Sequence, residues 1–177
     1  MLIKFEPGTD SELFLRILES AEDHRYRDHW GIDPIAIVRA IRNLLLGRRL
    51  EGASTIEQQY VRTCTGNRKI SLVRKCEEVT VSILLALSSD KNDIAHSYIC
   101  CAYFGEGLCG YKSVISALWS EESDSSTDLY RAAVVIAMLK RPKPIGDSAK
   151  WKIALQNRAN YIVSRHIKSS PPPPPVP

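Results

Sequence analysis

Apolar side chains recur along the chain with the spacing of helix faces. Between positions 10 and 21 they stand mostly three or four residues apart, at Leu13, Phe14, Ile17, Leu18 and Ala21, which predicts an amphipathic helix. Segments with similar spacing follow at 35–45, 70–88, 92–103, 111–119, 128–140 and 149–168. The alternation typical of strands is rare. The pattern favours an all-α fold of about eight helices, with no sheet larger than a hairpin.

Three local patterns refine these helices. Asp33-Pro34 predicts an N-cap followed by a proline in the first turn, and the apolar stripe after it ends at Gly47. The run from Ser54 to Glu57 has the form of a capping box, so we expect another helix to begin there. Residues 79–87 are mostly apolar, which predicts a helix that is buried on most sides.

The composition is that of a soluble globular domain, with 44% hydrophobic and 25% charged residues. A net charge of +4 is too small for a dedicated nucleic-acid binder, but it suits a protein that handles phosphates or an anionic surface. No apolar run approaches the ~20 residues that span a bilayer, and the N-terminus lacks the apolar core of a signal peptide. Either the chain is soluble as made or an anchor has been removed from it.

The chain has five cysteines, which are Cys64, Cys76, Cys100, Cys101 and Cys109. An odd number without CxxC spacing argues against a disulfide framework and against a zinc site. We therefore expect reduced thiols that serve as small core residues.

The chain ends in a run that is almost pure proline, at 171–177. Such a run favours a polyproline II extension, so we predict a domain over 1–168 and a proline-rich tail over 169–177. A solvated end is the simpler interpretation, and binding of the tail to a partner that recognises proline is the alternative.

Four short segments combine residue types that do chemistry. Residues 22–31 are rich in acidic residues and histidine, although His24 and His29 are five apart, a poor spacing for a metal on a helix. Residues 51–59 place glycine and hydroxyls before a helix, whose free N–H groups can hold phosphate. Residues 74–78 set two cations beside two carboxylates, and residues 91–110 end in an aromatic-glycine turn. Each segment alone also has a purely structural explanation.

The order of these segments resembles glycosyltransferase family 51, the peptidoglycan transglycosylases. EDHRYRDHWGIDPIAIVRA, EGASTIEQQ, RKCEE and KNDIAHSYICCAYFGEGLCG are similar to its first four motifs, and residues 132–142 together with 157–162 resemble the fifth region. The resemblance implies a lysozyme-like helical domain with a small mobile jaw segment, in a bacterial protein that is soluble or peripheral at the inner membrane. Departures are Glu57 for the usual Thr, Cys100 for the usual Asn, and a basic, polar stretch at 60–73 where the family is apolar.

The resemblance also implies a reaction. Family members polymerise lipid-linked disaccharides (lipid II-like) with inversion and release a polyprenyl diphosphate. By motif match Glu22 is the general base, and Glu78 is a second carboxylate that orients the cations or helps to hold Mg²⁺ or Mn²⁺. Arg74 and Lys75 match residues that face the diphosphate, and Arg62 can join them. The remaining substrate-binding candidates are Asp23, His29, Ser54, Thr55, Gln58 and Gln59.

Two other functions stay open at this point. A lysozyme-like hydrolase would also use carboxylates in a helical cleft, but it has no need of the two cations Arg74 and Lys75. A catalytically degenerate module that binds lipid-linked sugar or a partner protein would explain the changes at Glu57 and Cys100. We also expect residues 60–73 to be the most mobile segment, and Arg62, Arg68 and Lys69 to give weak contact with anionic membranes.

Overall fold

The computed structural model describes residues 2–7, 11–48, 52–67, 69–119, 129–146 and 148–169. The chain forms two compact units that interleave in sequence. Unit 1 comprises residues 1–7 and 22–102, and unit 2 comprises residues 8–21 and 103–177.

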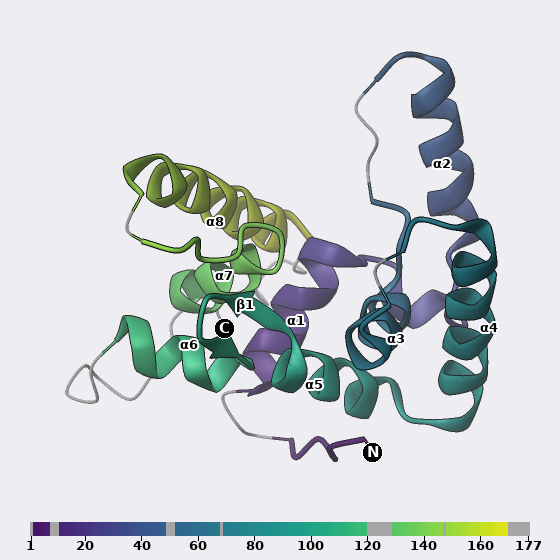
Figure 1. The fold of residues 1–177 in the computed structure, drawn as a ribbon, viewed down its shortest axis with the longest axis horizontal. Coiled ribbons are helices and arrows are strands. Elements are labelled where there is room, and N and C mark those ends of the chain that lie inside the picture. Colours follow the sequence, from purple (N-terminus) through teal and green to yellow (C-terminus); the bar gives the residue numbers. More distant parts are fainter. Residues whose placement is uncertain are drawn as a thin grey trace, which may run out of the picture. The chain divides into compact units, whose positions relative to one another are not determined.

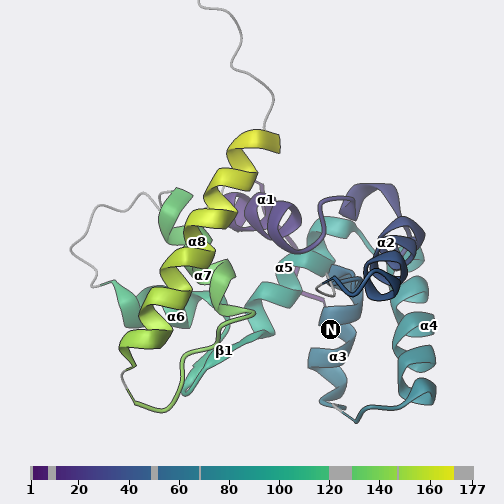
Figure 2. The same cartoon turned by 90° about the horizontal axis from the view of Figure 1, so that it is seen from above.

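Helices dominate both units, as Figures 1 and 2 show. The elements of unit 1 are η1 (Tyr26–Asp28), α2 (Pro34–Leu45), α3 (Ile56–Thr65), α4 (Leu72–Ser88) and α5 (Lys91–Cys101). Those of unit 2 are α1 (Ser11–Glu22, whose last residue belongs to unit 1), β1 (Tyr103–Gly105), β2 (Leu108–Cys109), α6 (Tyr111–Leu118), α7 (Leu129–Met138) and α8 (Ala149–Ser169). In the described residues the one sheet is the antiparallel pair β1–β2. The predicted all-α fold, with nothing larger than a hairpin, is confirmed.

The core of unit 2 is built around α7. Every residue of this helix from Ala132 to Met138 is buried, as expected for a helix that is apolar on all sides. It lies alongside α8 in both views (Figures 1 and 2). The buried residues of α8 recur at Leu155, Ala159 and Ile162, which is one stripe of a helix.

In unit 1, α3 packs against both α4 and α5. The predicted start of α2 is confirmed, because the Asp33 side chain accepts hydrogen bonds from the N–H groups of Ile35 and Ala36. The predicted capping box is wrong. Thr55, not Ser54, is the N-cap of α3, and Glu57 is turned inward to Lys91 instead of back to the cap.

Two further predictions are corrected by the structure. Residues 79–87 are not buried on most sides, since the buried residues of α4 are Glu78 and Ser82 and Leu87 is 64% exposed. Glu78 and Ser82 find their partners within α4, Lys75 of this cluster binds Gln58 on α3, and much of the apolar surface of the helix stays exposed. All five cysteines are free thiols, but Cys64, Cys76 and Cys109 are exposed and so are not core residues.

The predicted domain boundary at residue 168, the proline-rich tail, the mobile jaw segment and the mobility of residues 60–73 all stay predictions. Helix α8 ends at Ser169, and the proline-rich run at 171–177 lies outside the described residues. The stretch at 60–73 comprises the end of α3, a linker that starts with Gly66 in the left-handed conformation, and the start of α4, and Arg68 lies outside the described residues. No helix among the described residues is long and apolar enough to cross a membrane.

Candidate active site

Glu22, the predicted base, is the half-buried last residue of α1. Its charge acts on Tyr98 of α5. Burial, and then the negative charge of Glu22, raise the pKa of Tyr98 above its usual value, although Arg62 acts in the opposite direction. The Tyr98 hydroxyl donates a 2.8 Å hydrogen bond to Oε1 of Gln59 on α3. Gln59 thus binds this tyrosine directly, and Glu22 and Arg62 lie close enough for their charges to act on it.

Glu78 is the buried centre of an ion cluster on α4. Its side chain is 3% exposed, and its oxygens accept hydrogen bonds from Arg74 Nη1 at 2.5 Å and from Lys75 Nζ at 2.7 Å. Burial by itself would raise the pKa of Glu78. The hydrogen bonds from Lys75 and Arg74, together with the positive charge of Arg62, outweigh burial and hold this pKa below its ordinary value. Glu78 is therefore a fixed anion that positions two cations.

Gln58 connects this cluster to the loop that follows Glu22. Its Oε1 accepts a 2.7 Å hydrogen bond from Lys75, and its Nε2 donates to the carbonyl oxygen of Gly31 at 3.1 Å. The Thr55 hydroxyl donates to the same oxygen at 2.8 Å. Gly31 must be glycine here, because its φ is +82° and a Cβ would lie 2.5 Å from the Ser82 carbonyl oxygen. The first three motifs therefore meet in space.

Asp23 and His29 are both buried and bind each other. His29 Nε2 lies 3.0 and 3.1 Å from the two carboxylate oxygens of Asp23, and Asp23 Oδ2 accepts a hydrogen bond from the N–H of Ile56. A carboxylate at the N-terminus of α3 is stabilised by the helix dipole. The pair fastens the loop to α3, and its contact with substrate stays a prediction.

A cavity of about 290 Å³ lies beside the ion cluster. It is lined by Val61, Thr65, Asn67, Arg74, Glu77, Glu78 and Val81. The Arg74 side chain is also fixed by a second hydrogen bond, which its Nε donates to the Lys69 carbonyl oxygen at 2.5 Å. Ser54, another predicted substrate-binding residue, is half-buried just before Thr55, the N-cap of α3. The arrangement offers a cationic side chain at the wall of a cavity, which suits an anionic ligand.

Comparison with known proteins identifies the family. Residues 9–166 match the family described as transglycosylase. This chain belongs to the transglycosylase family. It is 31% identical over 150 residues to penicillin-binding protein 1A of Rickettsia typhi, a match that covers 82% of this chain and 19% of the relative.

Other relatives give the same result. Penicillin-binding protein 1A of Aquifex aeolicus is 32% identical over 150 residues, covering 84% of this chain and 20% of the relative. Penicillin-binding protein 1B of Haemophilus influenzae is 31% identical over 151 residues, covering 82% and 19%. The chain thus spans about a fifth of the length of these relatives.

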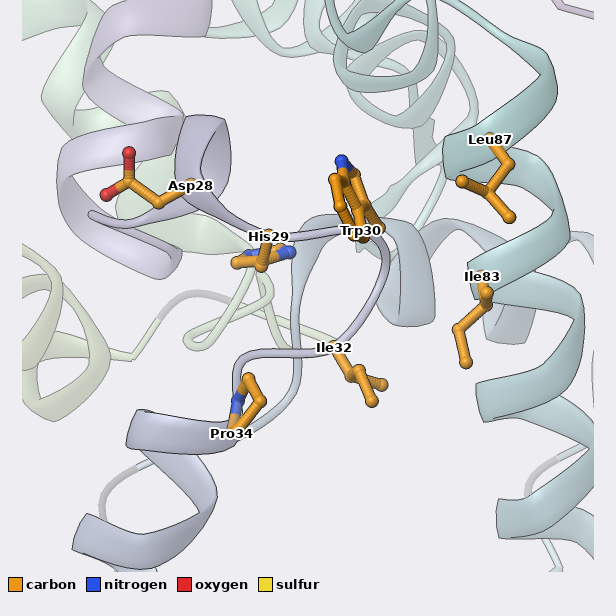
Figure 3. A pocket seen from close by; sticks show the side chains of 7 residues that line it. All are labelled: Asp28, His29, Trp30, Ile32, Pro34, Ile83 and Leu87. Carbon is orange, nitrogen blue, oxygen red and sulfur yellow. The ribbon is translucent and has the colours of Figure 1, made fainter.

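This transglycosylase-family chain also has a mostly apolar cavity of about 360 Å³, here called the loop cavity, which the sequence did not reveal. It is lined by Asp28, His29, Trp30, Ile32, Pro34, Ile83 and Leu87. Figure 3 shows Trp30 and Ile32 on the loop, across from Ile83 and Leu87 on α4. Part of the apolar half of α4, at Ile83 and Leu87, therefore lines this cavity.

Two residues of this candidate site escaped sequence reasoning because their partners are distant in the chain. Tyr98 binds Gln59, 39 residues away, and Lys91 binds Glu57, 34 residues away. The predicted metal role of Glu78 stays a prediction. Both of its oxygens already accept hydrogen bonds from the cations Arg74 and Lys75. Among the described residues, potential metal ligands converge instead at Asp23, His29 and Glu57.

Proposed function

We propose that this chain is a peptidoglycan glycosyltransferase, which polymerises a lipid-linked disaccharide with inversion and releases a polyprenyl diphosphate. One observation carries the proposal. In a chain of the transglycosylase family, Arg74 lies at the wall of a cavity and is positioned by the buried anion Glu78. A leaving diphosphate gains negative charge as its bond to the sugar breaks, so positioned cations lower the barrier.

Glu22 is the base in this proposal. The 4-hydroxyl of the acceptor sugar attacks the anomeric carbon of the donor, its proton passes to the Glu22 carboxylate, and the bond from that carbon to the diphosphate oxygen breaks. A positioned base contributes roughly 10²–10⁴-fold to such a step. The half-buried position of Glu22 at the end of α1, close enough for its charge to act on Tyr98, supports the assignment.

Arg74, Lys75 and Arg62 are the cations proposed for the diphosphate. Arg74 and Lys75 are each bound to Glu78 before any substrate arrives, so little free energy is spent on ordering them during the reaction. Their remaining N–H groups are the donors available to the diphosphate. Mg²⁺ or Mn²⁺ would act mainly on the diphosphate oxygens, because Glu78 is already occupied by the two cations.

The proposed contact with a membrane is supported by α2, which projects from the rest of unit 1 in Figure 1. Apolar side chains on this helix are exposed, including Val38 at 66% and Leu45 at 81%. Arg42 and Arg48 are exposed on the same segment. Apolar side chains flanked by basic ones favour the membrane interface, so contact through α2 is better supported than contact through Arg62 and Lys69 alone.

The proposal is tested by supplying the purified chain with labelled lipid-linked disaccharide, with and without Mg²⁺ or Mn²⁺. We expect a ladder of glycan polymers and equimolar release of polyprenyl diphosphate. Binding of the labelled substrate without any polymer would support the non-catalytic module instead. Release of new reducing ends from finished peptidoglycan, without polymerisation, would support a hydrolase.

A further inference from the structure

We propose that Asp23, His29 and Glu57 form a binding site for one divalent transition-metal ion inside unit 1. This site is separate from the cations Arg74 and Lys75, and the inference does not depend on the proposed function. One potential ligand atom from each of the three residues lies within 4.8 Å of the others. All three side chains are buried, and Glu57 is 0% exposed.

The two carboxylates of this cluster are held by hydrogen bonds, and Glu57 keeps one oxygen available. The N–H of Ile56 donates to Oδ2 of Asp23, and Lys91 Nζ donates to Oε1 of Glu57. Oε2 of Glu57 is buried and has no hydrogen-bond partner among the described residues. A buried carboxylate oxygen without a partner is costly. Metal-binding carboxylates often have this arrangement, with one oxygen on the ion and the other fixed by a donor.

His29 supplies the third ligand. Its Nδ1 is buried and likewise lacks a partner among the described residues, while its Nε2 faces Asp23. His29 Nε2 and an Asp23 oxygen, 3.0 Å apart, have the separation of neighbouring ligands on one ion, so His29 would ligate through Nε2. His29 also lines the loop cavity in Figure 3, so the cluster borders that cavity.

The charge of the cluster also favours a cation. Asp23 and Glu57 are two carboxylates, and among the described residues Lys91 is the one ammonium group that contacts them directly, through Glu57. Lys91 is itself fixed, because it donates to the His29 carbonyl oxygen at 2.8 Å and lies 4.3 Å from the centre of the Tyr26 ring. If His29 is neutral, as a metal ligand must be, Lys91 balances only one of the two carboxylates. The other negative charge lies in the protein interior, where charge is poorly solvated.

The ligand types indicate which ion fits. One imidazole and two carboxylates suit Zn²⁺, Co²⁺, Mn²⁺ or Fe²⁺, whereas Mg²⁺ prefers oxygen ligands and retains several waters, for which a buried site has little room. A bound ion would join the loop that carries Asp23 and His29 to the first turn of α3. Its role would therefore be to stabilise unit 1 and keep the start of α3 in place.

The test is a titration of the whole chain, freed of metal with a chelator, with Co²⁺ in the absence of substrate. We expect one ion per chain, a visible absorption spectrum of nitrogen and oxygen ligation, and a raised melting temperature. Glu57→Gln keeps the shape of the side chain and should weaken binding at least ~10-fold. Glu77→Gln, an exposed carboxylate on α4, is the matched control and should bind as the unmodified chain does.

A second variant and a second signal keep the test decisive if Glu57→Gln folds poorly. Asp23→Asn should also weaken binding, with folding of both variants checked by far-UV circular dichroism. A sulfur-to-cobalt charge-transfer band would assign the ion to the cysteines and overturn the proposal. Failure to bind Co²⁺ or Zn²⁺ would overturn it too, as would unchanged affinity in folded Glu57→Gln or Asp23→Asn. Loss of binding in Glu78→Gln alone would place the ion at the diphosphate site instead.

Discussion

Lys75 of α4 donates a 2.7 Å hydrogen bond to the side-chain oxygen of Gln58 on α3, and the same ammonium group binds Glu78 at 2.7 Å. Gln58 in turn holds the carbonyl oxygen of Gly31. A single side chain therefore links a cation of the proposed diphosphate site to the loop that follows Glu22. The free energy that fixes this cation comes from folding, so the substrate does not have to supply it.

Replacing Glu22 should remove the base and leave the binding site intact. In Glu22→Gln we expect turnover to fall by roughly 10²-fold or more, with donor affinity little changed, because the amide keeps the size of the side chain but cannot accept a proton. Polymerisation of lipid-linked disaccharide and equilibrium binding of the donor are the measurements. Glu19→Gln, one turn earlier on α1, is the control and should retain activity. Near-normal turnover in Glu22→Gln would refute the assignment.

Replacing Glu78 should change both the site and the acid stability. The pKa of Glu78 is lowered in the folded protein, so its contribution to stability is present above pH 4.5, the ordinary pKa, and is lost as pH falls through the folded pKa. In Glu78→Gln the difference in unfolding free energy from the unmodified chain should therefore shrink below pH 4.5. Denaturant titrations across pH measure this difference, and a difference that is constant with pH would contradict the prediction.

Glu78→Gln should also weaken donor binding as well as turnover, unlike Glu22→Gln. The reason is that Arg74 and Lys75 lose the anion that positions them. The two variants are compared in the same binding and polymerisation assays. Equal donor affinity in both would show that Glu78 does not organise the diphosphate site.

Gly31→Ala should destabilise unit 1 by roughly 2–4 kcal/mol. A Cβ at this position would lie 2.5 Å from the Ser82 carbonyl oxygen, and the φ of +82° is unfavourable for alanine. Gly47→Ala is the matched control, because Gly47 also has positive φ (+62°) but its Cβ would meet no atom within 4 Å. Chemical denaturation of both variants separates the cost of the contact from that of the backbone conformation.

The exposed apolar residues of α2 should mediate binding to lipid vesicles. Val38→Asp or Leu45→Asp should reduce binding to vesicles of a neutral and an anionic phospholipid, because each places a charge where an apolar side chain meets the interface. Ile153→Asp, at a position that is 58% exposed on α8, is the control. Co-sedimentation at low and high salt is the measurement. A purely electrostatic contact would give a different result: high salt would abolish binding, and neither substitution on α2 would change it.

Stability should also fall at high pH because of Tyr60. Burial, together with the thiols of Cys64 and Cys101, raises the pKa of Tyr60 from 10.0 to about 12. The neutral phenol is thus favoured in the fold, so its contribution is present below pH 10 and is lost as pH rises toward 12. The unmodified chain should lose stability more steeply than Tyr60→Phe in this range. Ultraviolet titration of the phenolate checks the pKa directly.

Local sequence determined the helices and several of their ends. The spacing of apolar residues located seven of the eight α-helices of the described chain to within a few residues, the run from Ser54 to Glu57 indicated the start of α3, and Asp33-Pro34 marked the start of α2. These features depend on a few neighbouring residues, which the sequence displays directly. The sequence also placed four motifs in the order of a known family, and the match over residues 9–166 confirms that membership.

Only the tertiary structure decided which side chains meet and which face solvent. The apolar half of α4 looks like a core helix in sequence, yet its inward face is the polar pair Glu78 and Ser82. Glu57 fits a capping box locally, but Lys91, 34 residues away, draws it into the interior. A buried charge is stable only beside its partner, and the distance in sequence between partners carries no local signal. For the same reason, only the fold shows that Asp23, His29 and Glu57 lie close together.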